Sequence, residues 1–221
     1  MKNIKKKIKF KVAVDGSSAS GKTTGGKIIA KKFKMDFLSS GTLYRFCALK
    51  TLENGNKYDK KFIDKVAKSI TIKKLNNSKL YSPEVTKISS IIAKRPFVRN
   101  ALKSFQKSFI KKSDLVVIEG RDIGSKIMPN ADLKIFFKCS IKEKAKRRIK
   151  DFKSQNKKIK LKDVEKALIQ RDKEDFKRKI SPLIMTKNAV LVDTTKLTVK
   201  QMKSKLINIV DKSILKKHGN L

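Results

Sequence analysis

The chain has few of the residues that carry most acid–base and metal chemistry. It contains one histidine, two cysteines and no tryptophan. His218 lies in a lysine-rich stretch near the C-terminus, so we interpret it as a solvated residue and expect no histidine base. Cys47 and Cys139 lie far apart and lack metal-ligand spacing. Two isolated thiols are typical of a reducing compartment, and we expect a cytoplasmic protein.

Long apolar runs are also missing. No run approaches the roughly 18 residues that a membrane-spanning helix needs. The basic stretch from Lys2 to Lys11 lacks the apolar segment and the small-residue cleavage site of a signal peptide. We therefore expect neither a membrane span nor a secretory signal. A length of 221 residues suits one α/β domain with a good core.

Acidic residues are scarce, because 19 Asp and Glu face 58 Lys and Arg, for a net charge of +39. Such a charge favours nucleic-acid partners when it gathers in a patch. Here lysine recurs in every full block of ten residues, and no interleaved aromatics suggest a platform for stacking bases. We expect a lysine-rich solvated surface with salt-sensitive polyanion binding, and no dedicated nucleic-acid partner.

Arginine is rare among the basic residues. Because the chain uses lysine for general positive charge, we expect arginine where a planar fork of donors must hold a phosphate or a base. The arginines are Arg45, Arg95, Arg99, Arg121, Arg147, Arg148, Arg171 and Arg178.

A phosphate-binding loop follows the apolar run Val12–Val14. Residues 16–23 match the pattern of Gly, four residues, Gly, Lys, then Ser or Thr. The backbone N–H groups of such a loop and the helix start after it hold phosphate oxygens, while the lysine and the hydroxyl serve the terminal phosphates and Mg²⁺. A Gly/Ser-rich surface turn is the alternative, which the amphipathic helical pattern that follows disfavours. We expect a nucleoside triphosphate to bind Gly16, Ser17, Ser18, Ala19, Ser20, Gly21, Lys22, Thr23 and Thr24, with Thr23 as the Mg²⁺ ligand.

Apolar runs predict five strands, and helical patterns separate them. The expected strands are Ile8–Val14, Asp36–Leu38, Leu115–Ile118, Leu133–Phe137 and Ala189–Val192. The expected helices cover 22–33, 42–53, 61–68, 83–94, 97–111, 142–155, 162–178 and 198–216. Pro83 and Pro96 suit first helical turns, and Thr198 suits an N-cap. The alternation predicts an α/β fold of the P-loop NTPase type, with a parallel sheet flanked by helices.

Two stretches interrupt the strand–helix alternation. Residues 53–95 form an insertion between the second and third strands, and residues 149–161 read as a loop between two helices. No internal repeat or linker is evident, so we expect one domain over 1–221. Its core then comprises 1–52, 96–148 and 162–221.

Two further segments follow strands and carry polar chemistry. Residues 39–45 open a helix and predict a second backbone anion site, with Arg45 as a clamp; an ordinary serine N-cap is the alternative. Arg121 and Asp122 follow the third strand, at the sheet edge where open α/β folds bind ligands. A buried Arg–Asp pair is the alternative there.

Arginines also recur on one helix and before the loop at 149–161. Arg171, Asp175 and Arg178 are spaced i, i+4 and i+7, so one helix face presents two guanidinium groups around a carboxylate. A surface row of ion pairs has the same spacing. Arg147 and Arg148 lie where a lid over a triphosphate needs positive charge, and we expect one to face ligand and the other solvent.

These segments together resemble the bacterial-type cytidylate kinases, which phosphorylate CMP and dCMP. The resemblance covers nearly the whole chain in order. The matching stretches are Val14 to Thr24, Ser40 to Arg45, Arg95 to Arg99 with Gln106, Glu119 to Gly124, Pro129 to Phe136, Arg147-Arg148, Arg171-Asp172, Arg178 with Ser181 to Leu183, and Asp193 to Thr195.

The resemblance implies a five-stranded parallel sheet with a small nucleotide-monophosphate insertion and a lid, acting as a monomer on ATP, Mg²⁺, CMP and dCMP. It assigns roles in groups. Lys22, Arg121, Arg178 and Arg147 would be catalytic. Ser40, Tyr44 and Arg45, with Arg121 and Arg178, would hold the acceptor or its phosphate. Ser90, Arg99 and Asp122 would read cytosine, and Arg171 and Asp175 would contact the ribose.

Three positions depart from the family pattern. Ser39 replaces an aspartate, Tyr81 stands where arginine is usual, and Thr23 occupies a position that often holds glycine. The insertion is short, with Ile70 to Tyr81 in place of a small extra sheet. These differences bear on base and sugar selectivity. The rival readings are another P-loop kinase, for adenylate, uridylate or a non-nucleotide alcohol, and a P-loop NTPase that acts on RNA or the ribosome.

Overall fold

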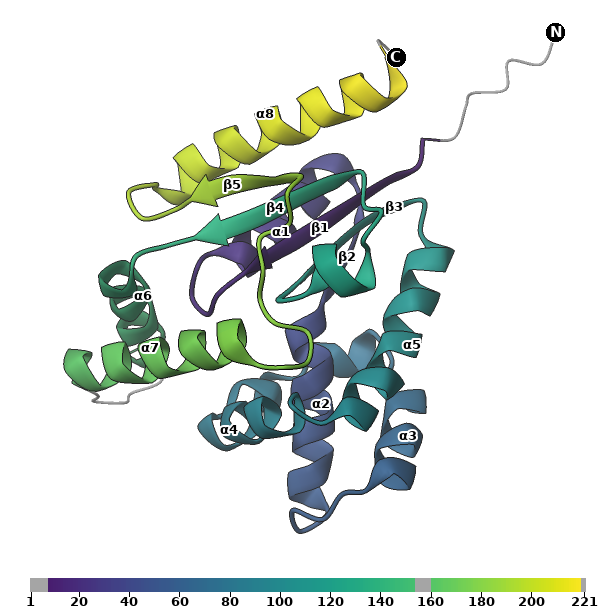
Figure 1. The fold of residues 1–221 in the computed structure, drawn as a ribbon, viewed down its shortest axis with the longest axis vertical. Coiled ribbons are helices and arrows are strands. Elements are labelled where there is room, and N and C mark those ends of the chain that lie inside the picture. The colour runs from purple at the N-terminus through teal and green to yellow at the C-terminus, as the bar shows by residue number, and fades with distance from the viewer. Residues whose placement is uncertain (1–7, 154–159, 220–221) are drawn as a thin grey trace, which may run out of the picture. The chain divides into compact units, whose positions relative to one another are not determined.

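The computed structural model describes residues 8–153 and 160–219. The chain divides into two compact units (Figure 1). Unit 1 comprises the chain up to Leu38 and from Asp114 onward, and unit 2 comprises Ser39–Ser113. The predicted insertion at 53–95 lies inside unit 2, whose bounds extend beyond it on both sides.

Unit 1 is built on a five-stranded parallel sheet in the order β2-β3-β1-β4-β5. The strands are β1 (Phe10–Gly16), β2 (Asp36–Ser39), β3 (Leu115–Gly120), β4 (Leu133–Lys138) and β5 (Ala189–Asp193). All five predicted strands are confirmed. The bounds predicted for the first strand, Ile8–Val14, were wrong at both ends, because β1 begins at Phe10 and includes Gly16, the first glycine of the loop. That glycine pairs with Phe137 of β4, which extends the strand.

Burial explains the apolar strand sequences. Val12, Ala13 and Val14 of the central strand are fully buried, as strands covered on both faces require. At the edge of the sheet, β5 leaves Val190 and Leu191 exposed. The registers of β1 with β3 and with β4 set their carboxyl ends side by side, so that Asp15 lies opposite Gly120 and Phe136.

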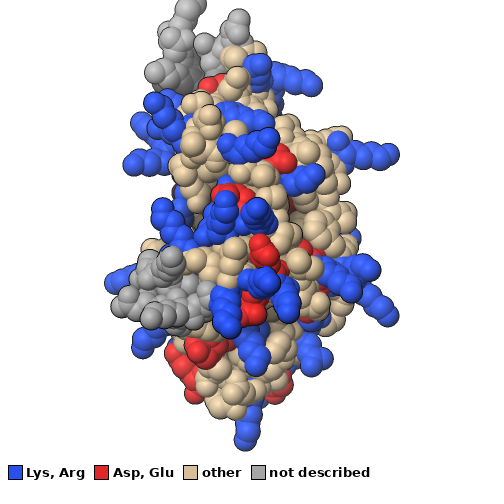
Figure 2. Space-filling view, turned by 90° about the vertical axis from the view of Figure 1, so that its left-hand side faces the viewer, with Lys and Arg blue, Asp and Glu red and all other residues tan. Residues whose placement is uncertain are grey.

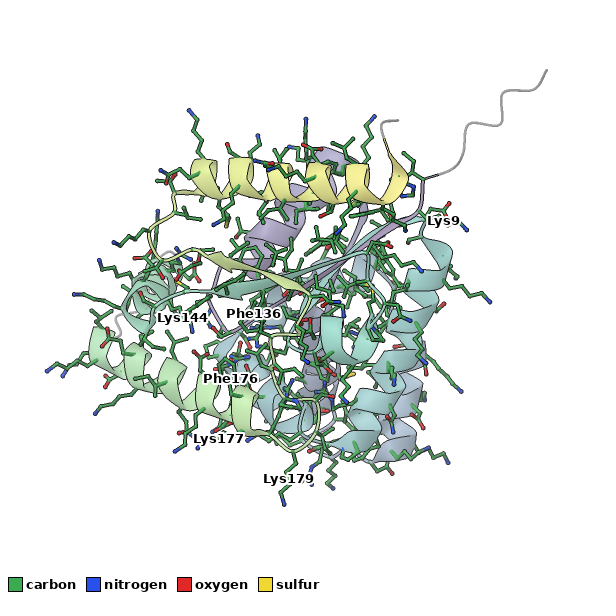
Figure 3. The ribbon with its side chains drawn as sticks, turned by 45° about the horizontal axis from the view of Figure 1, so that its top comes forward. Lys9, Phe136, Lys144, Phe176, Lys177 and Lys179 are labelled. Atoms are coloured by element: carbon green, nitrogen blue, oxygen red, sulfur yellow. The ribbon has the colours of Figure 1, made fainter. Side chains whose placement is uncertain are left out.

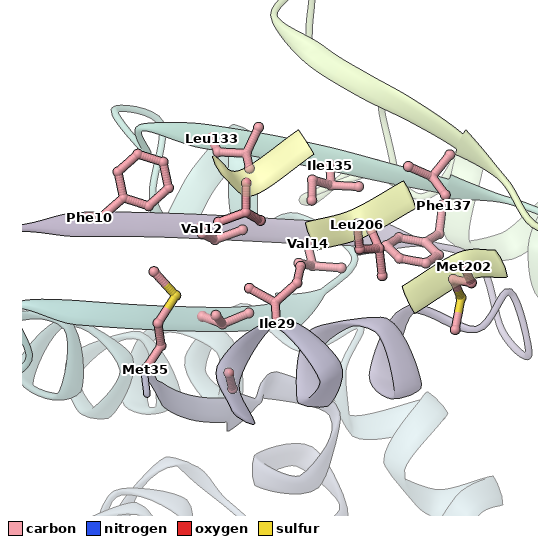
Figure 4. Close-up of a cluster of buried hydrophobic side chains, with 14 residues drawn as sticks. Phe10, Val12, Val14, Ile29, Met35, Leu133, Ile135, Phe137, Met202 and Leu206 are labelled. Carbon is pink, nitrogen blue, oxygen red and sulfur yellow. The ribbon is translucent and has the colours of Figure 1, made fainter. Parts of the chain in front are cut away.

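Two helices of unit 1 pack on one face of the sheet. They are α1 (Lys22–Phe33) and α8 (Val199–His218). Ile29 of α1 and Leu206 of α8 lie against Val14 and Phe137 in one buried cluster (Figure 4). Thr198 caps α8 in a reciprocal capping box with Gln201, which confirms the predicted N-cap. His218 ends α8 and is half-buried, with Nε2 enclosed, so its interpretation as a solvated residue was wrong.

The other helices of unit 1 are α6 (Ile141–Lys153) and α7 (Leu161–Lys177), with a π-helical turn, η3 (Ile123–Ile127), after β3. Ala145 of α6 packs on Val164 and Leu168 of α7. α6 extends to Lys153, so the loop predicted at 149–161 was wrong in its first residues. Residues 154–159 of that loop lie outside the described residues.

Unit 2 is helical. It contains α2 (Ser40–Glu53), α3 (Lys60–Lys68), α4 (Pro83–Ile92) and α5 (Pro96–Lys112), with short 3₁₀ turns η1 (Lys73–Asn76) and η2 (Ser78–Tyr81). Pro83 and Pro96 begin α4 and α5, as expected, because proline lacks an N–H that the first turn leaves unbonded. The predicted helices agree with those observed to within about two residues at most ends.

Lysine and arginine side chains are scattered over the face shown in Figure 2, with a few acidic residues among them. Within residues 8–153 and 160–219, no helix has both the length and the apolar character to cross a bilayer. Cys47 and Cys139 are both buried free thiols. Burial raises the pKa of Cys47 to about 12, so this residue stays a protonated and unreactive thiol.

We expect Gly25→Ala to destabilise the chain by about 1–3 kcal/mol. A Cβ at Gly25 would lie 2.4 Å from Phe137 Cζ and 3.1 Å from Leu206 Cδ1, so the core must shift. This outweighs the gain of about 1 kcal/mol in helix propensity. Chemical denaturation measures the change. Lys27→Ala, at an exposed position of α1, is the control and should change stability by less than about 0.5 kcal/mol. Equal stabilities of the two variants would contradict this packing.

Candidate active site

The loop between β1 and α1 has a strained backbone. Ala19 and Gly21 have φ values of 57° and 88°, in the left-handed region. Such alternation turns successive N–H groups toward one concavity, which suits an anion. Gly16 is required for a different reason, because a Cβ there would lie 2.7 Å from Phe137 O and 2.9 Å from Ser20 Oγ. Ser20 Oγ is fully enclosed without a hydrogen-bond partner among the described residues.

Lys22 begins α1 and folds back over the loop. Its Nζ donates to the carbonyl oxygen of Ser17 at 3.3 Å and lies 3.8 Å from Glu119 Oε2. Burial lowers the pKa of Lys22 to about 7, and the charge of Arg121 acts in the same direction, against the opposing charge of Glu119. A large share of Lys22 is therefore the neutral amine near pH 7, and it gains a proton when an anion binds beside it.

Glu119 is a site residue to which sequence reasoning assigned no role. It is almost fully buried at the end of β3, and its Oε1 accepts a hydrogen bond from Thr23 Oγ1 at 3.0 Å. The two residues are 96 positions apart. A hydroxyl and a carboxylate side by side next to a phosphate loop are oxygen donors of the kind that Mg²⁺ prefers. The signal available in the sequence was the acidic residue at the carboxyl end of a buried strand.

Arg121 and Arg178 share one carboxylate. Arg121 Nε donates to Asp175 Oδ2 at 2.7 Å, and Arg178 Nη1 lies 3.4 Å from Asp175 Oδ1. All three side chains are about 15% exposed. Asp175 is thus neither part of a surface row of ion pairs nor paired through its own helix alone. Arg121 pairs with Asp175 and not with Asp122, so the alternative of a buried pair between these two neighbours was wrong.

The charges of this network hold one another ionised. Burial acts to raise the pKa of Asp175, but the charge and hydrogen bond of Arg121, with the charge of Arg178, more than offset it and lower the pKa. Burial likewise acts to lower the pKa of Arg121, and Asp175 outweighs it, so this pKa is raised. The geometry therefore keeps two guanidinium groups charged and aligned in the absence of ligand.

The helices α6 and α7 are tied by a second ion pair. Lys144 projects from α6 (Figure 3). Its Nζ donates to Asp172 Oδ2 of α7, and the lysine side chain is almost fully buried. Asp172 Oδ1 is enclosed without a hydrogen-bond partner among the described residues. The pair fixes the register of α7, and so the height of Arg171, Asp175 and Arg178 along it.

Arg147 lies beside the phosphate loop. Its Nη2 donates to Thr194 O at 2.8 Å and its Nη1 to Thr194 Oγ1 at 3.1 Å, while Nε pairs with Glu143. A Cβ at Gly21 would lie 3.5 Å from Arg147 Nη1. Thr194 Oγ1 in turn donates to Ser20 O at 2.9 Å. Arg148 pairs with Asp151. The expected division of one arginine toward ligand and one toward solvent stays a prediction.

In unit 2, Arg45 is held by η2 and α4. Its Nη1 donates to Leu80 O at 3.0 Å and to Thr86 Oγ1 at 2.9 Å. Its Cζ lies 5.1 Å from the ring centroid of Tyr81, which is half exposed. Tyr81, which stands where arginine is usual in the family, thus supports the guanidinium of Arg45 by a cation–π contact.

Arg99 and Ser40 are buried in the same unit. Arg99 Nη1 donates to Ala93 O at 3.1 Å, and its Cζ lies 5.5 Å from the ring centroid of Tyr44. Ser40 Oγ accepts a hydrogen bond from Gln106 Nε2 at 2.9 Å. Ser90 Oγ donates to Thr86 O within α4. Ser39 is the N-cap of α2 but its side chain makes no capping bond, so the alternative of an ordinary serine cap does not apply.

The predicted site residues therefore form two groups. In unit 1 the structure brings Lys22 toward Glu119, and Arg121 and Arg178 onto Asp175; Asp122 is buried on the same turn as Arg121, and Arg171 lies one turn before Asp175. In unit 2, Ser40, Tyr44, Arg45, Ser90 and Arg99 lie on α2, α4 and α5. Each group combines cationic and hydrogen-bonding side chains that suit a phosphorylated ligand.

Removing the shared carboxylate should cost stability. We expect Asp175→Asn to destabilise the chain by about 3 kcal/mol at pH 7, because two largely buried guanidinium groups lose their counter-charge. The lowered pKa of Asp175 means that its contribution is present above the unfolded pKa of about 3.9 and is lost as the pH falls through the folded value. Urea denaturation from pH 7 down to pH 3 measures both.

The control for this prediction is Glu53→Gln, which removes an exposed pair with Lys50. It should cost less than about 1 kcal/mol. An Asp175→Asn variant as stable as this control, or a deficit that does not shrink in acid, would contradict the shared ion pair.

Comparison with known proteins shows which family the chain is similar to. The family model described as cytidylate kinase matches residues 12–212. A cytidylate kinase from Thermotoga maritima is 34% identical over 213 residues, 91% of this chain and 96% of that protein. One from Rickettsia conorii is 35% identical over 206 residues, 93% of each chain. A solved Thermus thermophilus structure, 14% identical with a TM-score of 0.50, covers 93% of this chain and 98% of that one, and shares the fold. This chain belongs to the cytidylate kinase family.

Proposed function

We propose that the chain transfers the γ-phosphoryl group of ATP to CMP or dCMP, giving CDP or dCDP. The observation that carries this is a strained phosphate loop with Lys22 in the same unit as the Arg121–Asp175–Arg178 network. The match of residues 12–212 to the cytidylate kinase family supports CMP or dCMP as the phosphoryl acceptor. The loop supplies the donor site, and the arginines supply the charge that phosphoryl transfer requires.

ATP fits the loop from Gly16 to Thr24. The loop offers backbone N–H groups at the start of α1 and the amine of Lys22. Lys22 would serve the terminal phosphates, the role of the lysine in such a loop. Arg147, held on Thr194 beside Gly21, adds a positive charge at the donor site.

Mg²⁺ fits the pair of Thr23 and Glu119. The hydroxyl and the carboxylate are hard oxygen donors, and Mg²⁺ commonly takes one or two protein ligands with phosphate oxygens and water completing its shell. Bound there, the ion neutralises charge on the triphosphate. Thr23 and Glu119 then hold it, and Glu119 also keeps Lys22 near the loop.

The acceptor needs no protein base. The phosphate of a nucleoside monophosphate has a second pKa of about 6, so near pH 7 its oxygens are already largely deprotonated. The obstacle is the repulsion between two polyanions. Arg45, Arg121 and Arg178 counter it, with Ser40, by neutralising the acceptor phosphate and the equatorial oxygens of a loose transition state.

Cytosine presents an amino donor beside ring and carbonyl acceptors, and uracil replaces that donor with an acceptor. Arg99 supplies donors and Asp122 an acceptor, which complement cytosine, with Ser90 as a further hydroxyl. Tyr44 supports Arg99 through its ring. Arg171 and Asp175 contact the ribose. Asp175 thus serves both the sugar and the two arginines that it aligns.

The remaining assignments belong to the same proposal. Residues 149–161, of which the first five end α6, act as a lid, and residues 53–95 act as the monophosphate-binding insertion. Each limits ATP hydrolysis by excluding water. The enzyme acts as a monomer in the cytoplasm, where its buried thiols stay reduced.

An acceptor panel with γ-labelled ATP tests the function. We expect label to pass to CMP and dCMP, with kcat/KM for UMP lower by at least about tenfold. Arg99→Lys should narrow the ratio of CMP to UMP by about tenfold, because lysine cannot present two parallel donors. Arg95→Lys, at an exposed position of unit 2, should leave the ratio unchanged.

The same panel separates the rival readings. Label on AMP, UMP or an alcohol at the rate of CMP would overturn the base assignment. Phosphate release that RNA stimulates, with no labelled monophosphate, would replace the proposal by an RNA-associated NTPase.

The lowered pKa of Lys22 predicts proton uptake on binding ATP. At pH 8 a group with a pKa of about 7 is mostly neutral, and a neighbouring triphosphate raises that pKa and recruits a proton. Calorimetric titrations with a non-hydrolysable ATP analogue, in buffers of different ionisation enthalpy, measure the protons taken up. Uptake should be larger at pH 8 than at pH 6, where Lys22 is already charged.

Lys22→Arg provides the matched comparison. Arginine stays protonated, so the charge remains while the titration disappears. Equal uptake by the two proteins at pH 8 would show that another group supplies it and would contradict the assignment to Lys22.

A further inference from the structure

Asp15 accepts two hydrogen bonds from the backbone of the turn that follows Arg121. It is the residue directly before the first glycine of the phosphate loop, and it is 6% exposed. Its Oδ1 accepts a hydrogen bond from Ile123 N at 2.8 Å, and its Oδ2 accepts one from Gly124 N at 2.7 Å. One carboxylate therefore bonds two consecutive backbone N–H groups across more than one hundred positions of sequence.

The bonded N–H groups belong to the residues that follow Arg121 and Asp122. They open η3, a single π-helical turn, which is an uncommon local structure that concentrates at functional sites. In the sheet Asp15 lies opposite Gly120, so register fixes the turn on one side and the carboxylate fixes it on the other. Asp15 thus connects the donor loop with the turn that presents an acceptor-site arginine.

The fold keeps this carboxylate at a cost. Burial raises the pKa of Asp15 to about 6, and Asp122 adds to the increase, while the two backbone hydrogen bonds and Arg121 oppose it. Gly124 also fits Asp15 closely, because a Cβ there would lie 3.3 Å from Oδ2 and 3.2 Å from Lys134 Cδ. Two backbone N–H groups at this point need two acceptor oxygens, and a carboxylate supplies both, which offsets part of the cost of burying its charge.

We propose that Asp15 is a positioning residue: it holds the Arg121–Asp122 turn in register with the phosphate loop and thereby sets the rate of transfer. The role rests on the proposed function and goes beyond it, since the buried carboxylate of Asp15 bonds backbone N–H groups through both of its oxygens. The two bonds act as a clamp, because a rotation of the turn that releases one of them strains the other.

Asp15→Asn tests the clamp with little change in volume. Asparagine has one acceptor oxygen, and its amide would place a donor against the second N–H group. We expect kcat with CMP to fall about 10- to 100-fold, with KM for ATP changed less than about threefold. The melting temperature should fall no more than in the control, because the variant also removes a buried charge.

The control is Asp132→Asn. Asp132 likewise accepts a backbone N–H, from Lys11 at 2.7 Å, and pairs with Lys217, but it lies at the opposite end of β1 from the phosphate loop. Its variant should leave kcat unchanged. A second test variant, Gly124→Ala, keeps the carboxylate but places a methyl group against Asp15 Oδ2. We expect it to lower kcat in the same way.

Amide hydrogen exchange gives a readout that does not depend on activity. The amides of Ile123 and Gly124 should exchange slowly in the native chain and at least about tenfold faster in Asp15→Asn, while the amides of the strands should exchange at unchanged rates. Unchanged exchange at these two amides would overturn the proposal, as would a kcat equal to that of Asp132→Asn. If the native chain transferred no label to any acceptor, the proposed function would fail, and the rate-setting role of Asp15 would fail with it. The exchange data would still decide whether Asp15 holds the turn.

Discussion

Compensation of buried positive charge is the constraint on which unit 1 depends. Phosphoryl transfer needs several cations around one point, yet an unpaired buried cation costs several kcal/mol. The chain resolves this by giving each cation a carboxylate: Glu119 for Lys22, and Asp175 for Arg121 and Arg178. Because the lowered pKa of Asp175 keeps that carboxylate ionised before any ligand arrives, the proposed substrates meet guanidinium donors that are already aligned, and less reorganisation remains for the reaction itself.

The parallel sheet makes that compensation possible. Carboxyl ends of β1 and β3 lie side by side, so the phosphate loop, Glu119 and the Arg121 turn emerge at one edge. The core beneath is closely packed, with Phe137 of β4 against two glycines of the loop and of α1. Small residues at these points let the loop approach the sheet. Asp15 completes the arrangement, because it bonds the turn after β3 from the strand that leads into the loop.

Local signals allowed much of this to be predicted. The loop from Gly16 to Thr23 is contiguous in sequence, and caps such as Thr198 or first-turn prolines act within one helical turn, so their patterns appear in the sequence itself. The contacts that were missed are non-local. Thr23 meets Glu119 across 96 positions and Arg121 meets Asp175 across 54, and neither spacing leaves a periodic trace. The first strand was misplaced because its pairing with β4, rather than its composition, carries it to Gly16.

The sequence by itself determined the fold class, the phosphate loop, the sparing use of arginine and the family to which the chain belongs, since each depends on residue type and short-range order. Tertiary structure decided which carboxylate neutralises which cation, and therefore which groups stay charged and which, like Lys22, sit near the point of titration. The physical reason is that pKa values and ion pairs depend on burial and on distance through space, and folding alone sets both.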